Sequence, residues 1–100
     1  AGFRVIVCGD GQEAIDFYRK HSNSIDLALL DYRMPRRDGV EVFDSIQKIS
    51  PDLPAILMSG NLAGAEIRNL ERRGLRSVLR KPCSRDEVLR TVRAALDTEP

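Results

Sequence analysis

The sequence of 100 residues predicts a single α/β domain in which helices cover both faces of a parallel sheet. Two observations predict this fold class. Short apolar segments bounded by turn residues alternate with amphipathic helical patterns along the chain, which is typical of parallel strands joined by crossover helices. The first two such segments, Arg4–Cys8 and Leu27–Asp31, are apolar almost throughout, as strands covered on both sides must be. We therefore expect four strands and four helices within residues 1–100.

The first strand, Arg4–Cys8, leads into a helical pattern that begins near Asp10. Asp is a favoured N-cap residue, and Glu13 stands three residues later, where it can complete a capping box. The residues that this helix should turn inward are Ala14, Ile15 and Tyr18. The second strand, Leu27–Asp31, follows this helix and ends on a carboxylate.

The second helix should begin after Gly39 and end before the segment SPDLP, because its two prolines cannot continue a helix. Its expected inward residues are Val42, Phe43, Ile46 and Ile49. The third strand is expected at Ala55–Ser59, which is apolar until its last residue.

The third helix is expected over residues 63–73, with Ile67 and Leu70 inward and Gly74 as a C-terminal cap. The fourth strand is expected at Ser77–Lys81. The last helix opens with the segment SRDE, in which Ser84 and Glu87 form a complete capping box. Its expected inward residues are Val88, Leu89, Val92, Ala95 and Leu96.

The composition argues against some classes of protein but does not indicate a function. With 42% hydrophobic residues, 31% charged residues and a net charge of +1, the totals indicate neither a nucleic-acid nor a membrane partner. No apolar run approaches the about 20 residues of a membrane-spanning helix, and the first residues lack a signal-peptide core, so we expect a cytoplasmic protein. Cys8 and Cys83 lack CxxC spacing and are expected to be free thiols.

Three polar residues stand at the carboxyl ends of three different expected strands: Asp31, Ser59 and Lys81. In a parallel sheet these ends share one edge, which is where open α/β sheets bind ligands. Each residue alone has an ordinary explanation, as a turn cap, a hydroxyl that satisfies local backbone, or a solvated lysine. Their joint placement favours a site where an anion is formed or bound, because lysine supplies charge and serine a hydrogen bond.

The segments LALLDYRMPRRDG, AILMSG and SVLRKPCSRDEV resemble the receiver domain of response regulators, the phospho-accepting module of two-component signalling. The likeness covers essentially the whole chain, and the combination of D-x-x-M-P-x-x-D-G, a strand-end Ser and Lys-Pro is specific. It implies a flavodoxin-like fold and a histidine kinase or phosphotransfer domain as the partner.

The resemblance also implies roles for individual residues. Asp31 would be the phosphoryl acceptor, Ser59 the switch hydroxyl that turns toward the phosphoryl group, and Lys81 the lysine that pairs with the acceptor and then with the phosphate. The backbone carbonyl of Arg33 would help to hold Mg²⁺, and the Lys81-Pro82 bond matches one that is usually cis. The residues suit this chemistry independently, because a carboxylate that attacks phosphorus needs cations to bring two anions together.

The sequence departs from the family in two ways. The family begins with a strand that ends in an acidic pair, followed by a helix, and the segment RVIVC matches the family's second strand instead. In the usual order 2-1-3-4-5 the missing strand would lie between Arg4–Cys8 and Leu27–Asp31, so a segment outside this sequence, a partner chain or direct pairing must satisfy their backbone groups. Val78 also replaces the Tyr or Phe whose rotation usually accompanies the switch.

The missing acidic pair affects how tightly we expect the chain to bind Mg²⁺. Asp31 and the Arg33 carbonyl are the only certain oxygen ligands, and Asp10 should already be engaged as a helix cap. Because Mg²⁺ requires a nearly octahedral oxygen shell, we expect these 100 residues to bind it weakly and to accept phosphate poorly or not at all.

Other functions remain open at this stage. A pseudo-receiver that only binds a partner, without phosphorylation, is favoured by the missing acidic pair and opposed by the retained Asp31, Ser59 and Lys81. An aspartate-based phosphatase would carry a second Asp where Arg33 stands, so we do not expect an enzyme. Residues 66–95 are rich in basic residues, which indicates either a solvated face or a surface for a partner or a dimer.

Overall fold

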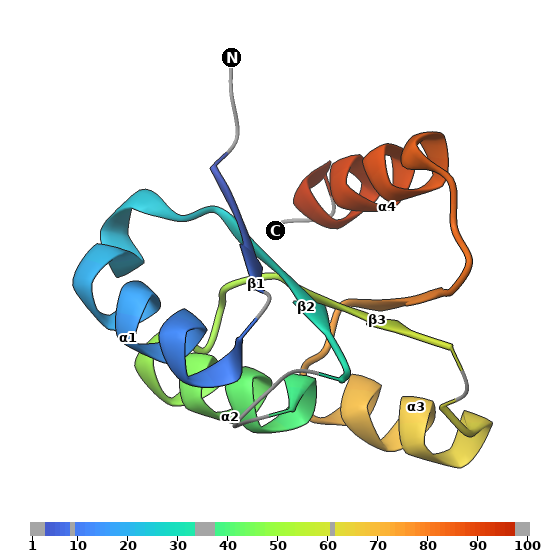
Figure 1. Ribbon diagram of the computed structural model, residues 1–100, viewed down its shortest axis with the longest axis horizontal. Coiled ribbons are helices and arrows are strands. Elements are labelled where there is room, and N and C mark those ends of the chain that lie inside the picture. Colours follow the sequence, from blue (N-terminus) through green and yellow to red (C-terminus); the bar gives the residue numbers. More distant parts are fainter. Residues whose placement is uncertain (1–3, 9, 34–37, 61, 98–100) are drawn as a thin grey trace.

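The computed structural model describes residues 4–8, 10–33, 38–60 and 62–97, which form one four-stranded sheet with helices on both faces (Figure 1). The elements in chain order are β1 (Val5–Cys8), α1 (Gly11–His21), the short 3₁₀ helix η1 (Ser22–Ser24), β2 (Leu27–Asp31), α2 (Gly39–Ile49), β3 (Ala55–Ser59), α3 (Gly64–Arg72), β4 (Ser77–Arg80) and α4 (Arg85–Asp97). The predicted fold class is confirmed. Every expected strand and helix is present, with ends shifted by a residue or so.

The sheet is parallel and follows the order of the chain, β1-β2-β3-β4. β1 pairs directly with β2, from Val5 opposite Leu27 to Cys8 opposite Leu30. Of the three ways to satisfy the backbone of these strands, the structure therefore shows direct pairing. The pair is also tied at its start, where Arg4 N–H donates to the Asp26 carboxylate at 2.9 Å and Asp26 N–H donates to the Arg4 carbonyl at 2.7 Å.

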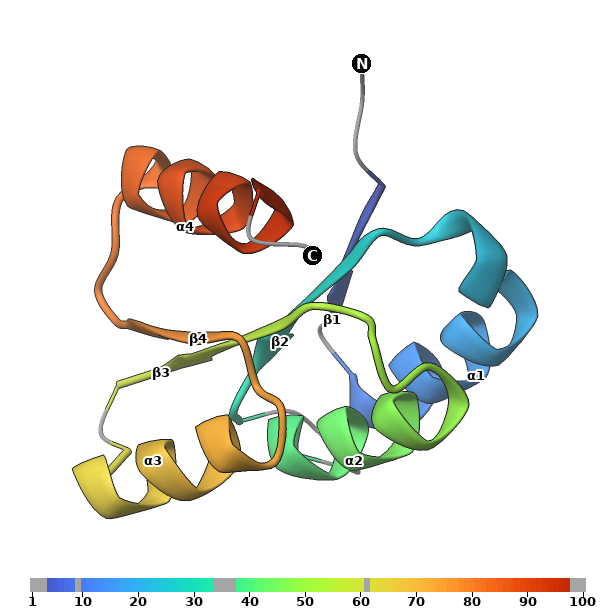
Figure 2. The same cartoon turned by 180° about the vertical axis from the view of Figure 1, so that it is seen from behind.

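The two faces of the sheet are covered unequally. Helices α1, α2 and α3 lie on one face and α4 lies on the other (Figures 1 and 2). The core on the three-helix side combines apolar residues of those helices with alternate strand residues, among them Tyr18, Ala28, Leu30, Phe43, Ile46, Leu57 and Leu70. The smaller core under α4 contains Leu27, Leu29, Ile56, Leu79 and Ala95. Because successive side chains of a strand point to opposite faces of the sheet, each strand contributes residues to both cores.

Side-chain caps define where the helices begin and end. Asp10 accepts hydrogen bonds from the backbone N–H groups of Gln12 and Glu13 and caps α1, as predicted. Ser84 and Glu87 form the expected reciprocal box before α4, with both bonds at 3.1 Å. At the other end of α3, Gly74 has a φ of 111°, a conformation that glycine adopts without strain.

Two residues expected to be inward are exposed. Ile49 is 40% exposed because it is the last residue of α2, beyond the helical turns that pack on the sheet. Leu89 is 52% exposed because Val88, Val92 and Ala95 form the stripe that contacts the sheet, and Leu89 lies one step around the helix from it. In the part of the chain that the structure describes, no helix has the length and apolar character needed to span a bilayer.

The core under α1 contains one polar atom that it does not satisfy. Tyr18 is fully buried, and its hydroxyl has no hydrogen-bond partner among the described residues. Burying a hydroxyl without a partner costs about 1–3 kcal/mol, because its hydrogen bonds to water are lost. The ring therefore stabilises the core, while the hydroxyl opposes that effect.

We predict that Tyr18→Phe raises the free energy of unfolding by about 1 kcal/mol, measured by urea denaturation, because it removes the unsatisfied hydroxyl and keeps the ring. The matched control is Tyr32→Phe, in which the tyrosine packs half-exposed against the same core and the change should stay within about 0.5 kcal/mol. A loss of stability in Tyr18→Phe would show that the hydroxyl has a partner after all.

Candidate functional site

The three polar residues predicted to converge do so at the carboxyl edge of the sheet. Asp31 ends β2 and lies opposite Met58, Ser59 ends β3 and lies opposite Arg80, and Lys81 follows directly after β4. The three line a hollow of about 390 Å³, together with Arg33 and Gly60. The parallel register therefore brings residues that are up to 50 positions apart in the chain into one site.

An ion pair joins two of these residues. The Lys81 ammonium nitrogen lies 2.6 Å from Oδ2 of Asp31, and the side chains are 43% and 28% exposed. The other carboxylate oxygen, Oδ1, accepts a hydrogen bond of 3.2 Å from the backbone N–H of Arg33. Both oxygens of Asp31 thus have donors, and the carboxylate still borders the solvent-filled hollow.

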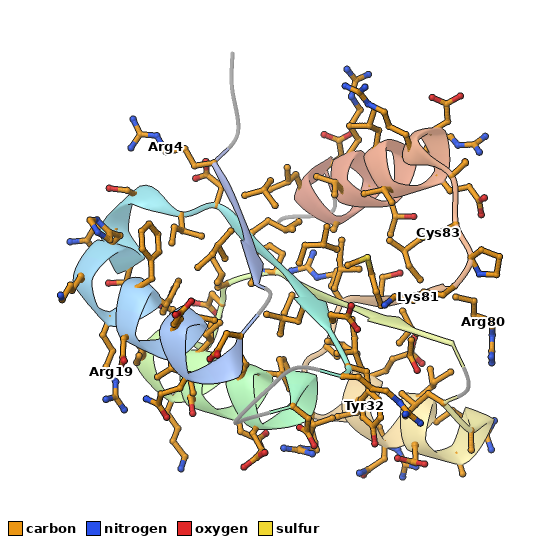
Figure 3. The ribbon with its side chains drawn as sticks, in the orientation of Figure 1. Arg4, Arg19, Tyr32, Arg80, Lys81 and Cys83 are labelled. Atoms are coloured by element: carbon orange, nitrogen blue, oxygen red, sulfur yellow. The ribbon has the colours of Figure 1, made fainter. Side chains whose placement is uncertain are left out.

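Backbone hydrogen bonds hold the strand ends that carry these side chains. Lys81 N–H donates to the Ser59 carbonyl at 3.0 Å, and Tyr32 N–H donates to the Met58 carbonyl at 2.9 Å. These bonds extend the sheet ladder one residue past the ends of β4 and β2. The Lys81-Pro82 peptide bond is cis, as the resemblance implied. In Figure 3 the Lys81 side chain lies over the sheet, whereas Arg80 projects away from it.

Ser59 differs from its neighbours in burial. It is 3% exposed and is the one buried polar residue in the core of the described chain. Its strand places it between the strands that carry Asp31 and Lys81, because β3 lies between β2 and β4. A hydroxyl in this position is well placed to serve a group bound in the hollow.

A close contact between the start of α2 and the end of β2 lies next to the site, and it could not be predicted from the sequence. Gly39, the first residue of α2, donates its N–H to the Tyr32 carbonyl at 2.9 Å. A Cβ atom at this position would lie 2.6 Å from both the Asp31 carbonyl oxygen and Leu57 Cδ1. Only glycine lets α2 approach β2 so closely. The sequence placed Gly39 just before the second helix, but it did not indicate this contact.

The described residues at the hollow supply few oxygen ligands for Mg²⁺. Among the residues that the structure describes, no group of three or more His, Cys, Asp or Glu side chains could hold a metal ion. Asp31 and the Arg33 carbonyl remain the oxygen donors at the hollow, and the Asp10 carboxylate is engaged as the cap of α1. Because Mg²⁺ requires about six oxygen ligands in nearly octahedral geometry, these donors leave most of its shell to water. The segment 34–37 of the motif lies outside the described residues.

The chain was compared with known proteins. The model of the response regulator receiver domain family matches residues 1–93. The chain belongs to this family. Its relatives include the transcription factor SKN7 of Chaetomium thermophilum, 37% identical over 92% of this chain and 12% of the relative, and the regulatory protein LuxO of Vibrio vulnificus, 34% identical over 95% of this chain and 20% of the relative. This receiver therefore spans a fifth or less of each of these relatives.

Solved receivers share the fold. The receiver domain of NtrX from Brucella abortus superposes with a TM-score of 0.80 at 26% identity, covering 98% of this chain and 82% of that one. CheY in the CheX-CheY-BeF₃-Mg²⁺ complex from Borrelia burgdorferi has a TM-score of 0.80 at 28% identity, covering 85% of this chain and 63% of that one. The flavodoxin-like fold and the assignment to two-component signalling are thus confirmed.

Several basic residues of the region 66–95 have structural partners. Arg76 donates to the Ala95 carbonyl at 3.0 Å and so ties β4 to the end of α4. Arg73 forms an ion pair with Asp44 and lies 6.0 Å from the centre of the Phe43 ring, which ties α3 to α2. Part of the basic surface therefore stabilises the fold.

Val78, where receivers usually carry a Tyr or Phe, is half-buried against the three-helix core and offers no aromatic ring to the site.

We predict that Gly39→Ala lowers the free energy of unfolding by about 1–3 kcal/mol, because the new methyl group forces α2 away from β2. The matched control is Gly64→Ala at the first residue of α3, where the methyl group would meet only a flexible arginine tip at 3.5 Å. Alanine favours helix over glycine by up to about 1 kcal/mol, so this variant should be as stable as the parent or more so. Equal urea midpoints for the two variants would contradict the close approach at Gly39.

Proposed function

We propose that this receiver accepts a phosphoryl group on Asp31 and that the new phosphoryl group switches the surface formed by α3, β4 and α4. The observation that carries the proposal is the ion pair between Asp31 and Lys81 in a hollow at the carboxyl edge of the sheet. Family membership supports it, because receivers are signalling modules. Phosphorylation of this chain itself is the step that we propose.

The transfer is a displacement at phosphorus. An oxygen of the Asp31 carboxylate attacks, a new oxygen–phosphorus bond forms, and the bond from phosphorus to the donor breaks. With acetyl phosphate as the donor, acetate leaves with the bonding electron pair. The Lys81 ammonium offsets the repulsion between the two anions before the transfer and is free to pair with phosphoryl oxygens after it.

Ser59 supplies the conformational step. The acyl phosphate adds negative charge and acceptor oxygens beside a hydroxyl that is already buried at the end of β3. A hydrogen bond from the hydroxyl to the phosphoryl group would draw the end of β3 toward Asp31. Because Lys81 N–H is bonded to the Ser59 carbonyl, such a movement reaches β4 and the start of α4 directly.

The proposed partner is a histidine kinase or a phosphotransfer domain, with the basic 66–95 face as a surface for docking or dimerisation.

Mg²⁺ would supply positive charge at the site. The CheX-CheY relative was solved in a complex with BeF₃ and Mg²⁺. With the donors of the described residues alone, we expect the ion to bind weakly and phosphoryl acceptance to be slow. The alternative is a pseudo-receiver, which would bind its partner without phosphorylation.

We predict that acetyl phosphate labels the chain slowly and on Asp31 alone, so that intact mass spectrometry shows one added phosphoryl group and Asp31→Asn shows none. The matched control is Asp38→Asn in the same connecting region, since Asn can still accept from the Glu41 N–H as a helix cap. This control should label at the parent rate.

This experiment distinguishes a phospho-accepting receiver from a pseudo-receiver. Labelling that is lost in Asp31→Asn and kept in Asp38→Asn supports the phospho-accepting receiver. If no labelling of the folded parent chain is seen at high donor and Mg²⁺ concentrations, the pseudo-receiver becomes the better description. Equal labelling of both variants would place the acceptor at another residue.

A further inference from the structure

The side of α4 that points away from the sheet carries a stripe of exposed residues. Its members line a hollow of about 370 Å³ and are Asp86, Leu89, Arg90 and Arg93. They recur three or four residues apart and therefore share one face of the helix. The opposite face of α4, which includes Val88, packs against the sheet. Charged side chains project outward from α4, away from the strands (Figure 3). We call these four residues the outer stripe of α4.

The outer stripe combines an exposed apolar side chain with unpaired charges. Leu89 is 52% exposed, more than any other large apolar side chain in the described chain. Among the described residues, no ion pair involves Asp86, Arg90 or Arg93. Protein interfaces commonly have an apolar centre inside a polar rim, and charges on the rim help to select the partner. The outer stripe has both features.

The charges of the outer stripe are arranged symmetrically about its apolar centre. Asp86 precedes Leu89 by three residues, and Arg93 follows Arg90 by three. The acidic and the basic residue are seven positions apart, about 10 Å along the helix axis, with the midpoint between Leu89 and Arg90. A second copy of α4, placed antiparallel about a twofold axis through this midpoint, would bring Asp86 of each copy opposite Arg93 of the other.

We propose that the outer stripe of α4 binds the same stripe of a second copy of this chain, through two reciprocal Asp86–Arg93 ion pairs on either side of Leu89. This inference deepens the proposed function and rests on it for its place in signalling, because it names the partner of one part of the basic 66–95 face. The pairing itself needs no phosphoryl group.

Charge balance favours a second copy over a strongly acidic partner. Asp97 follows Arg93 by four residues and continues the same side of the helix, so two aspartates and two arginines lie along it and their charges cancel. A surface that carries both signs in equal number can complement itself, whereas its aspartates would repel an acidic partner. One helix pair buries less than the about 1,200 Å² of a stable complex, so we expect a weak and reversible dimer.

The test measures self-association of the folded chain by analytical ultracentrifugation, without a phosphoryl donor. Protein concentrations extend to about 1 mM, because interfaces of this size are transient. We predict a monomer–dimer equilibrium for the parent chain. Asp86→Lys alone and Arg93→Glu alone should each weaken the dimer about tenfold or more, because each change places two pairs of like charges across the twofold axis.

An equimolar mixture of these two variants is the decisive measurement. In a dimer that contains one chain of each variant, both pairs across the axis again join opposite charges, so the mixture should regain the affinity of the parent. Leu89→Ala should also weaken the dimer, and it leaves the charges unchanged. The matched control is Arg68→Glu, which reverses an exposed charge of the basic 66–95 face on α3, outside the outer stripe, and should associate like the parent.

The outcomes distinguish this inference from the function on which it rests. A parent chain that stays monomeric at every concentration, a mixture that associates no better than its two components, or a control that weakens the dimer as much as Arg93→Glu would each overturn the paired stripes. Asp31→Asn should associate like the parent while it loses the phosphoryl label. A monomeric chain that is labelled on Asp31 keeps the proposed function and removes this inference, whereas a dimer that is never labelled removes the phosphoryl step and keeps the α4 interface.

Discussion

Parallel pairing in chain order is the constraint on which the rest of this structure depends. Because all the strands run in the same direction, their carboxyl ends lie at the same edge of the sheet. Asp31 and Ser59 each end a strand at this edge, and Lys81 directly follows one. In the described chain β1 pairs directly with β2. The register of β2, β3 and β4 brings Asp31, Ser59 and Lys81 together.

Stability and function depend on different parts of this receiver. The Asp31–Lys81 pair is partly exposed, and such pairs contribute only about 0–1 kcal/mol, because water screens them and two long side chains must be ordered. The apolar cores on the two faces of the sheet hold the fold instead. The charge arrangement of the site can therefore change at little cost to the fold.

The close packing behind the site limits which parts can move. Gly39 sets α2 against β2 at a distance that excludes any side chain, so the Asp31 end of the hollow is closely packed. On the opposite side, the Lys81 N–H is bonded to the Ser59 carbonyl one residue past the end of β4. α4 covers its face of the sheet alone (Figure 2).

The sequence by itself determined the four strands, the helix caps and the identity of the polar strand ends, because hydrophobic periodicity, cap chemistry and turn residues are local properties. It did not determine which strands pair, since direct pairing of β1 with β2 is a choice between distant segments. Nor could it show that Ile49 and Leu89 are exposed, or that Gly39 touches Asp31. The geometry of the Asp31–Lys81 ion pair was likewise decided by tertiary structure, because side chains 50 positions apart in the chain meet only when the sheet forms.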